Sequence, residues 1–75
     1  MKKKPNKSLG KYIRAQRKKL GISQDALANG LNMQQNGISK MEQGEYVNME
    51  YYADRLDVLL QLPPGTVTRK INRGK

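Results

Sequence analysis

The sequence predicts an all-α fold, a compact five-helix domain with flexible basic tails at both ends. Apolar residues recur at helical spacing in successive short segments, as at Leu9, Ile13 and Leu20. Glycines such as Gly21 and Gly44 close these segments, because glycine readily adopts the left-handed conformation of a helix C-cap. The chain has 75 residues, which is enough for one small domain.

The N-terminal segment combines a basic arm with the first expected helix. Residues 1–7 form the arm, since a proline and a run of lysines oppose helix formation there. Ser8 is the expected N-cap of the first helix, because its hydroxyl can accept a hydrogen bond from the first turn. Either Gln16 or Arg17 faces inward with the apolar residues, and Gly21 ends the helix.

Two further helices follow, with a tight turn between them. The second is expected at about 24–31 with Ser23 as its N-cap. The third is expected at 34–43 with Gly44 as its C-cap. Two short helices joined in this way, the second opening with uncharged amide side chains, are typical of a helix-turn-helix that reads DNA.

The C-terminal segment is expected to contain a fourth helix, an apolar stretch and a tail. Asn48 is a suitable N-cap for the fourth helix, which should end at a turn near Asp57. Residues 58–62 are expected to form a short fifth helix or a turn, which gives a folded domain over 8–62. Residues 63–75 begin with Pro-Pro-Gly and are expected to be a disordered basic tail. An exchanged strand or an added helix in a dimer is the alternative for this tail.

Positive charge is concentrated at the two ends of the chain. The net charge is +9, and residues 1–24 hold nine lysines or arginines and no acid. Residues 69–75 add four more bases, whereas all six acids lie between positions 25 and 68. This distribution favours a polyanionic partner that touches one face and both tails. The alternative is that the basic tails only keep a small protein soluble.

The residue types present exclude several classes of function. The chain has no cysteine and no histidine, so disulfides, metal sites built on those residues and histidine acid–base catalysis are not expected. We therefore expect no metal, no cofactor and no enzymatic activity. No apolar run approaches the ~20 residues of a membrane span, and no apolar region follows the initial Met-Lys-Lys-Lys as in a signal peptide. The expected location is the cytoplasm.

Two sequence pieces, G-I-S-Q and I-S-K-M-E-Q-G, lie at a separation that carries a family resemblance. With them, residues 9–62 resemble the phage-repressor, Cro-type (XRE-like) helix-turn-helix family. The resemblance implies a repressor-like five-helix domain, sequence-specific binding of duplex DNA, and a homodimer on a palindromic operator. Asn32 replaces the usual turn glycine, and asparagine tolerates the left-handed conformation. Gly37 replaces the usual small or β-branched residue before Ile38.

The resemblance also assigns residues that read bases. An amide side chain offers a donor and an acceptor and can bond adenine N6 and N7 in the major groove, so A·T pairs are expected in each half-site. Lys40 can reach guanine or a phosphate, or remain a solvated lysine. Gly37 either permits close approach of the backbone to DNA or is a tolerated helix weakness. The expected base-reading residues are Gln35, Asn36, Ser39 and Lys40.

A second set of residues is expected to contact phosphates. Gln24 resembles the family glutamine that holds a phosphate and braces the first residue of the recognition helix. Arg14 and Lys18 share one helical face, and Gln34 either caps its helix or touches a phosphate. The full set is Gln24, Gln34, Arg14, Lys18, Gln43, Tyr46, Lys3 and Lys4, although Tyr46 could instead pack on the surface. Arg17 and Glu42 match a family pair that forms a buried ion pair between the first and third helices.

These residues favour a transcriptional regulator, most simply a repressor that binds a palindromic operator as a dimer through the recognition helix 34–43. Tyr51 faces away from the apolar stripe of the fourth helix and is a candidate dimer contact. The alternative is an antitoxin or interaction module that regulates its own operon with a small protein partner. The observation that favours this alternative is a C-terminal tail without a clear role in the domain.

Overall fold

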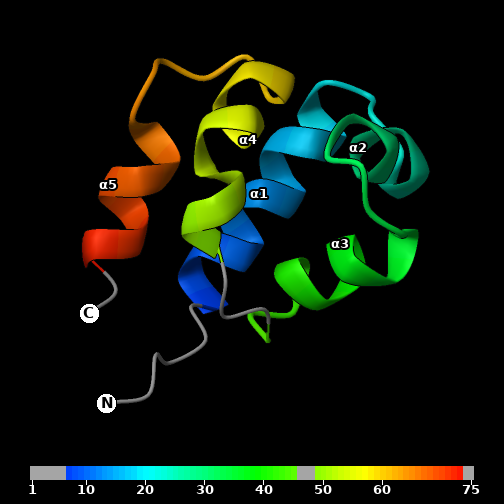
Figure 1. Cartoon of the computed structure of the whole chain (residues 1–75), viewed down its shortest axis with the longest axis horizontal. Helices are drawn as coiled ribbons and strands as arrows, with labels where there is room; N and C mark the ends of the chain where they lie inside the picture. Colours follow the sequence, from blue (N-terminus) through cyan, green and yellow to red (C-terminus); the bar gives the residue numbers. More distant parts are fainter. Residues whose placement is uncertain (1–6, 46–48, 74–75) are drawn as a thin grey trace.

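A computed structural model describes residues 7–45 and 49–73 of the chain (Figure 1). The described residues form five α-helices and one 3-10 turn, and they contain no strand. The prediction of an all-α, five-helix fold is therefore confirmed. The elements are α1 (Lys7–Lys19), α2 (Gln24–Gly30), α3 (Gln35–Glu42), η1 (Met49–Tyr52), α4 (Ala53–Leu59) and α5 (Thr66–Arg73).

The helices pack around a single apolar core. In Figure 1, α5 and α3 lie on opposite sides of the molecule with α1 between them. The inward stripe expected for the first helix is confirmed, since Leu9, Ile13 and Arg17 are buried. Gln16 also turns inward and donates a hydrogen bond of 3.2 Å from Nε2 to the carbonyl oxygen of Leu60. The buried apolar residues are Leu9, Ile13, Leu27, Ala28, Leu31, Ile38, Met41, Met49, Ala53, Leu56, Leu60 and Val67.

Helices α1 to α4 all end in the same hydrogen-bonded motif. In each, one residue takes a positive φ and the next residue donates its N–H back across the last turn, as Ile22 does to the Arg17 carbonyl at 3.0 Å. This arrangement satisfies carbonyl groups that the helix itself leaves without partners. The positive-φ residues that end these four helices are Gly21 (73°), Asn32 (58°), Gly44 (78°) and Gln61 (57°). The C-caps expected at Gly21 and Gly44 and the left-handed conformation of Asn32 are confirmed.

Helix boundaries in the N-terminal half differ slightly from the expected ones. Helix α1 begins at Lys7, so Ser8 lies inside the first turn and the prediction that it is the N-cap is wrong. The Lys7 backbone packs closely against Gly44, which places the first turn of α1 beside the end of α3. Helices α2 and α3 are shorter than expected by one or two residues. Asn48, the expected N-cap of the fourth helix, lies outside the described residues.

The C-terminal half differs more strongly. Helix α4 continues through Asp57 to Leu59, so the expected turn at Asp57 is wrong. Of the two forms expected for residues 58–62, the structure has a turn at 60–61 and not the fifth helix. That helix is α5, and Val67 within it is completely buried in the core. For the described residues, which run to 73, the predictions of a disordered tail from residue 63 and of a domain that ends at residue 62 are therefore wrong.

The cause of this difference is a carboxylate that the sequence pattern did not single out. Asp57 is 3% exposed, and its two oxygens accept hydrogen bonds from the N–H groups of Gly65 (2.8 Å) and Val67 (3.0 Å). These are backbone donors at the start of α5, which have no partner inside that helix. Asp57 thus joins the end of α4 to the start of α5, and Val67 anchors the new helix in the core.

Candidate nucleic-acid interface

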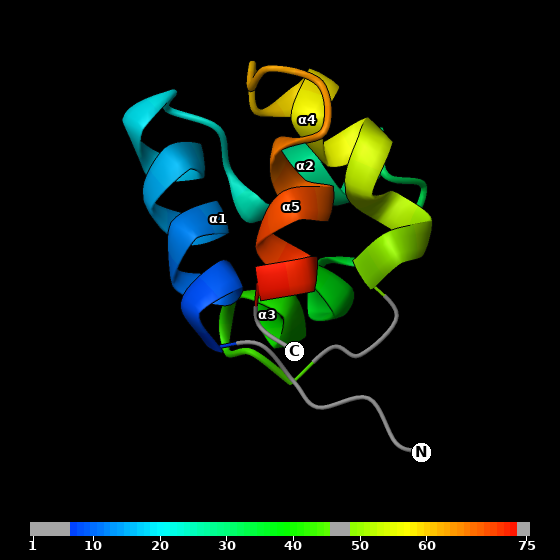
Figure 2. The same ribbon diagram turned by 90° about the vertical axis from the view of Figure 1, so that its left-hand side faces the viewer.

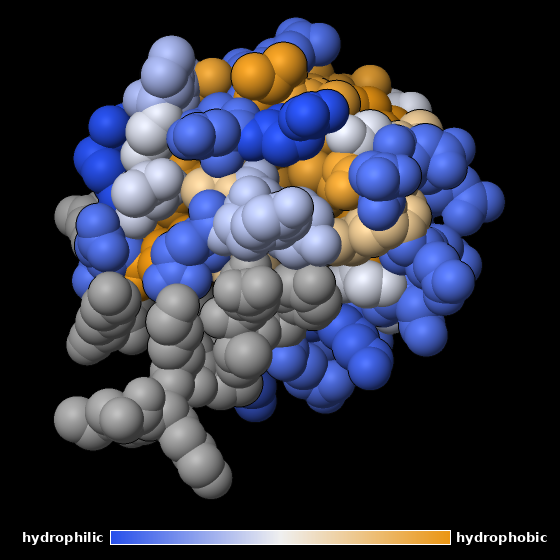
Figure 3. Space-filling view, viewed as in Figure 1, coloured by the Kyte–Doolittle hydropathy of each residue, from blue (hydrophilic) through white to orange (hydrophobic). Residues whose placement is uncertain are grey.

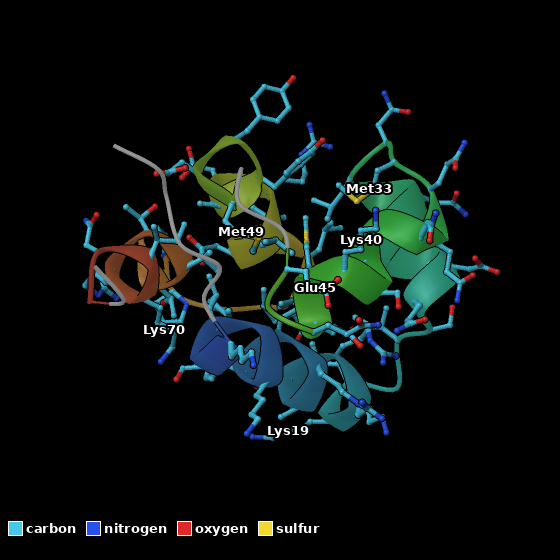
Figure 4. The ribbon with its side chains drawn as sticks, turned by 90° about the horizontal axis from the view of Figure 1, so that it is seen from below. Lys19, Met33, Lys40, Glu45, Met49 and Lys70 are labelled. Atoms are coloured by element: carbon cyan, nitrogen blue, oxygen red, sulfur yellow. The ribbon has the colours of Figure 1, made fainter. Side chains whose placement is uncertain are left out.

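The outward side of α3, with its N-cap residue, presents a row of polar side chains to solvent. Gln34, Gln35, Asn36 and Lys40 are exposed and Ser39 is half-buried. On the opposite side of the helix, the side chains of Ile38, Met41 and Glu42 are buried. The residues expected to read bases therefore share the outward side of α3. Lys40 is labelled there in Figure 4.

A chain of hydrogen bonds runs from the core to the first residue of this row. Arg17 and Glu42 form a buried ion pair, with Nε to Oε2 at 2.6 Å and Nη2 to Oε1 at 3.2 Å. Gln24 donates from Nε2 to Glu42 Oε1 at 3.0 Å. Gln35 in turn donates from Nε2 to Gln24 Oε1 at 2.8 Å. We call these four residues, Arg17, Glu42, Gln24 and Gln35, the brace network.

The brace network links three helices and leaves no buried polar atom unsatisfied. Arg17 also donates from Nη1 to the Ile22 carbonyl at 2.8 Å, which ties the ion pair to the turn after α1. Among the described residues, every buried side-chain nitrogen or oxygen atom has a hydrogen-bond partner. A buried ion pair tolerates its loss of hydration only when its partners are satisfied in this way. The network therefore fixes the orientation of α3 relative to α1 and α2.

Helix α1 approaches α3 so closely that only glycine fits at the crossing. A Cβ atom on Gly10 would lie 2.8 Å from the Glu42 carbonyl oxygen and closer still to that of Met41. Arg14 follows Gly10 by one helical turn, so it lies toward the α3 side of α1. Arg14 and Lys18 are both exposed. The structure thus places these two expected phosphate contacts on a helix that packs directly against α3.

The other residues expected to contact phosphates have different surroundings. Gln34 occupies the N-cap position of α3, but its side chain makes no capping hydrogen bond. Gln43 is exposed and donates from Nε2 to Ser39 Oγ at 3.0 Å, which joins the end of α3 to its outward side. Three further residues lie outside the described part of the chain, namely Tyr46, Lys3 and Lys4.

Sequence reasoning missed Met33, which lies in the turn before α3. A Cβ atom on Gly37 would lie 2.7 Å from the Met33 sulfur, so the glycine makes room for this side chain. Met33 is half-buried and packs against the core. It is labelled close to Lys40 in Figure 4. No local pattern indicates this pairing, because it depends on how the turn folds back over α3.

The surface around these helices is polar. Hydrophilic side chains line the outer edge of the molecule beside α2 and α3, with apolar side chains between them and the centre of the view (Figure 3). Among the described residues there is no cluster of three or more side chains suited to hold a metal ion. No helix within the described ranges is long and apolar enough to cross a membrane.

Comparison with known families assigns the fold. No curated protein shows significant similarity to the chain. A family model described as a helix-turn-helix domain matches residues 8–69, which is most of the sequence. The match includes the start of α5, and it confirms the family resemblance that the G-I-S-Q and I-S-K-M-E-Q-G pieces indicate. The chain belongs to the helix-turn-helix domain family associated with XRE-like DNA-binding regulators.

Proposed function

We propose that this DNA-binding regulator recognises a specific duplex sequence and represses transcription from it. Base reading is assigned to the outward side of α3, through Gln35, Asn36, Ser39 and Lys40. The observation that carries the proposal is the brace network, which holds Gln35 at 2.8 Å from Gln24 at the exposed start of α3. A side chain that is already oriented loses less conformational freedom when it binds a base.

The chemistry of this surface suits adenine. The bond to Gln24 uses one N–H of Gln35 and leaves its carbonyl oxygen and second N–H free to pair with a base edge. Asn36 follows directly and carries the same pair of groups. Each well-formed bidentate pair is worth roughly 1–3 kcal/mol of discrimination against the wrong base. We therefore expect A·T pairs in the bound sequence.

Phosphate contacts would position the domain on the duplex without adding sequence information. We assign these contacts to Arg14 and Lys18 on α1, and to Gln24 and Gln34 beside the turn before α3. Gln43 and Tyr46 follow the recognition helix in the chain. Lys3 and Lys4 belong to the basic arm, and we assign them contacts that tolerate any sequence.

A homodimer on a palindromic operator is part of the proposal. Tyr51 is 77% exposed and Val58 is 73% exposed, and these are the large apolar side chains that the described surface leaves most open to solvent. They lie seven residues apart on η1 and α4, and Tyr51 packs edge-to-face on Tyr52 at 4.9 Å between ring centroids. A two-fold contact through this face would cover both residues on each copy. The antitoxin alternative was based on a C-terminal tail without a clear role in the domain. Because Val67 of α5 is part of the core, this observation no longer supports that alternative.

Selection of bound sequences from a random duplex pool at ~150 mM salt tests the proposal under near-physiological screening. Recovery of a palindrome with half-sites about one helical turn apart would support a dimeric, sequence-specific regulator. Recovery of no consensus would contradict it. Sedimentation of the Tyr51→Ser/Val58→Ser variant tests the dimer separately: it should be monomeric, whereas wild-type self-association in this variant would reject the proposed contact.

A further inference from the structure

Met33 places an apolar group beside the polar row of α3. It directly precedes the N-cap residue Gln34, and its sulfur lies 2.7 Å from the position that a Cβ atom on Gly37 would take. Gly37 and Lys40 are three residues apart and are therefore neighbours on one face of the helix. Figure 4 labels Met33 next to Lys40. The thioether of Met33 thus occupies the place on α3 that a side chain at position 37 would take.

The protein covers Met33 only in part. The residue is half-buried and packs against the apolar core, whereas its apolar neighbours in the sequence, Leu31 and Ile38, are buried. Within residues 32–40, the other side chains that reach solvent are all polar. Met33 is therefore the apolar contact that this stretch offers to a molecule bound against α3.

The chemistry of the major groove supplies a partner for this contact. Unmodified DNA displays one methyl group there, on C5 of thymine, and apolar side chains recognise it. The same edge of an A·T pair carries adenine N6 and N7, for which the amides of Gln35 and Asn36 are suited. A methionine thioether is polarizable and adapts to an irregular apolar surface. We propose that Met33 reads the C5-methyl group of a thymine in the sequence bound by α3.

Removal of single thymine methyl groups tests this contact. Selection first supplies the bound duplex, and each thymine is then replaced singly by deoxyuridine, which lacks the methyl group but still pairs with adenine. Fluorescence anisotropy measures the affinity of the full chain for each duplex. We expect the affinity of the wild type to fall roughly fourfold at one thymine of each half-site, which is the factor for burial of one methyl-sized group.

Two variants link this loss to Met33. In Met33→Ala the apolar group is gone, so the same deoxyuridine replacement should leave the affinity unchanged. Leu62→Ala is the matched control, because Leu62 is also half-buried and packed against the core. Leu62 belongs to the loop between α4 and α5, which lies at the opposite end of the molecule from α3, so this variant should keep the fourfold loss (Figure 2). A loss that persists at every thymine in Met33→Ala, or that both variants abolish, would overturn the proposal.

A measurement on the wild-type chain applies even if Met33→Ala does not fold. With carbon-13 at the methionine ε-methyl groups, we expect a nuclear Overhauser effect between the Met33 ε-methyl protons and the C5-methyl protons of one thymine in the complex. Absence of this effect would overturn the proposal. Because the reading of thymine rests on the proposed function, recovery of no consensus by selection would overturn both. A consensus without a thymine methyl group that contacts Met33 would overturn only this contact.

Discussion

The α1–α3 half of the fold and the α4–α5 half are stabilised in different ways. In the first half, the brace network joins three helices through an ion pair and two glutamine amides, beginning with Arg17 and Glu42 at 2.6 Å. Both halves contribute apolar side chains to one core, but the second half is joined by a single buried carboxylate, since Asp57 holds the start of α5. The brace network orients a surface side chain, because it ends at Gln35, an exposed residue that is a candidate for reading bases. The carboxylate serves only the fold.

The two halves also differed in how well the sequence predicted them. Residues of the α1–α3 half occur in short pieces whose spacing is characteristic of the family. Asp57 stands in an acidic and apolar stretch where it resembles any solvated carboxylate at a helix end. The structural role of a residue can therefore be predicted from the sequence when its partners are close in the chain or belong to a known family motif. Arg17 and Glu42 meet the second condition, whereas Asp57 meets neither.

The largest expected effect comes from breaking the ion pair of the first half. Glu42→Ala leaves Arg17 buried without its partner, so the free energy of unfolding should fall by ~3–5 kcal/mol. Urea denaturation followed by circular dichroism measures this change. The same free energy of unfolding in Glu42→Ala as in the wild type would show that the ion pair does not stabilise the domain.

A smaller effect is expected in the second half. Asp57→Ala removes the acceptor for two backbone N–H groups, and the free energy of unfolding should fall by about 1–3 kcal/mol. Hydrogen exchange at the Val67 amide should accelerate, since α5 would open more often than the rest of the domain. Asp54→Ala is the matched control, because Asp54 is an exposed acid on the same helix and should change stability by less than ~0.5 kcal/mol. Equal behaviour of the two variants would rule out the capping role of Asp57.

Gln35→Ala should separate binding from stability within the brace network. Because the Gln35 side chain is exposed, the free energy of unfolding should change by less than ~0.5 kcal/mol. Affinity for a selected duplex should fall by roughly 1–3 kcal/mol, and preference at one base pair should relax. Fluorescence anisotropy with the selected duplex and its single-base variants measures both. Uniform weakening on every duplex would indicate a phosphate contact in place of base reading.

The smallest effect concerns the two non-glycine residues that end helices. Gln61 has a φ of 57°, where a residue with a Cβ is strained, so Gln61→Gly should stabilise the domain by about 0.5–1 kcal/mol. Asn32 has a φ of 58°, but asparagine tolerates this region, so Asn32→Gly should change stability by less than ~0.5 kcal/mol. Thermal unfolding of the pair of variants tests the difference. A gain for Asn32→Gly that exceeds the gain for Gln61→Gly would contradict this explanation.

Several features of the candidate site followed from the sequence because they are short-range. The C-caps at Gly21 and Gly44 and the amide-rich start of α3 depend on neighbouring residues. The Arg17–Glu42 pair followed from the family resemblance, since its partners lie 25 positions apart. By contrast, Met33 over Gly37 depends on the path of the turn, and nothing in the local pattern marks it.

The sequence by itself determined the helical class, the helix-turn-helix and the basic character of both chain ends, because periodicity, capping residues and charge are properties of short segments. Only the tertiary structure decided that residues 66–73 form a helix, since α5 requires the Val67 site in the core and the Asp57 carboxylate ten residues earlier. It also decided that helices α1 and α5 lie side by side, with the Lys70 Nζ over the Tyr12 ring. The physical reason is that a short, highly charged helix is marginal alone and forms when packing and a capping group stabilise it.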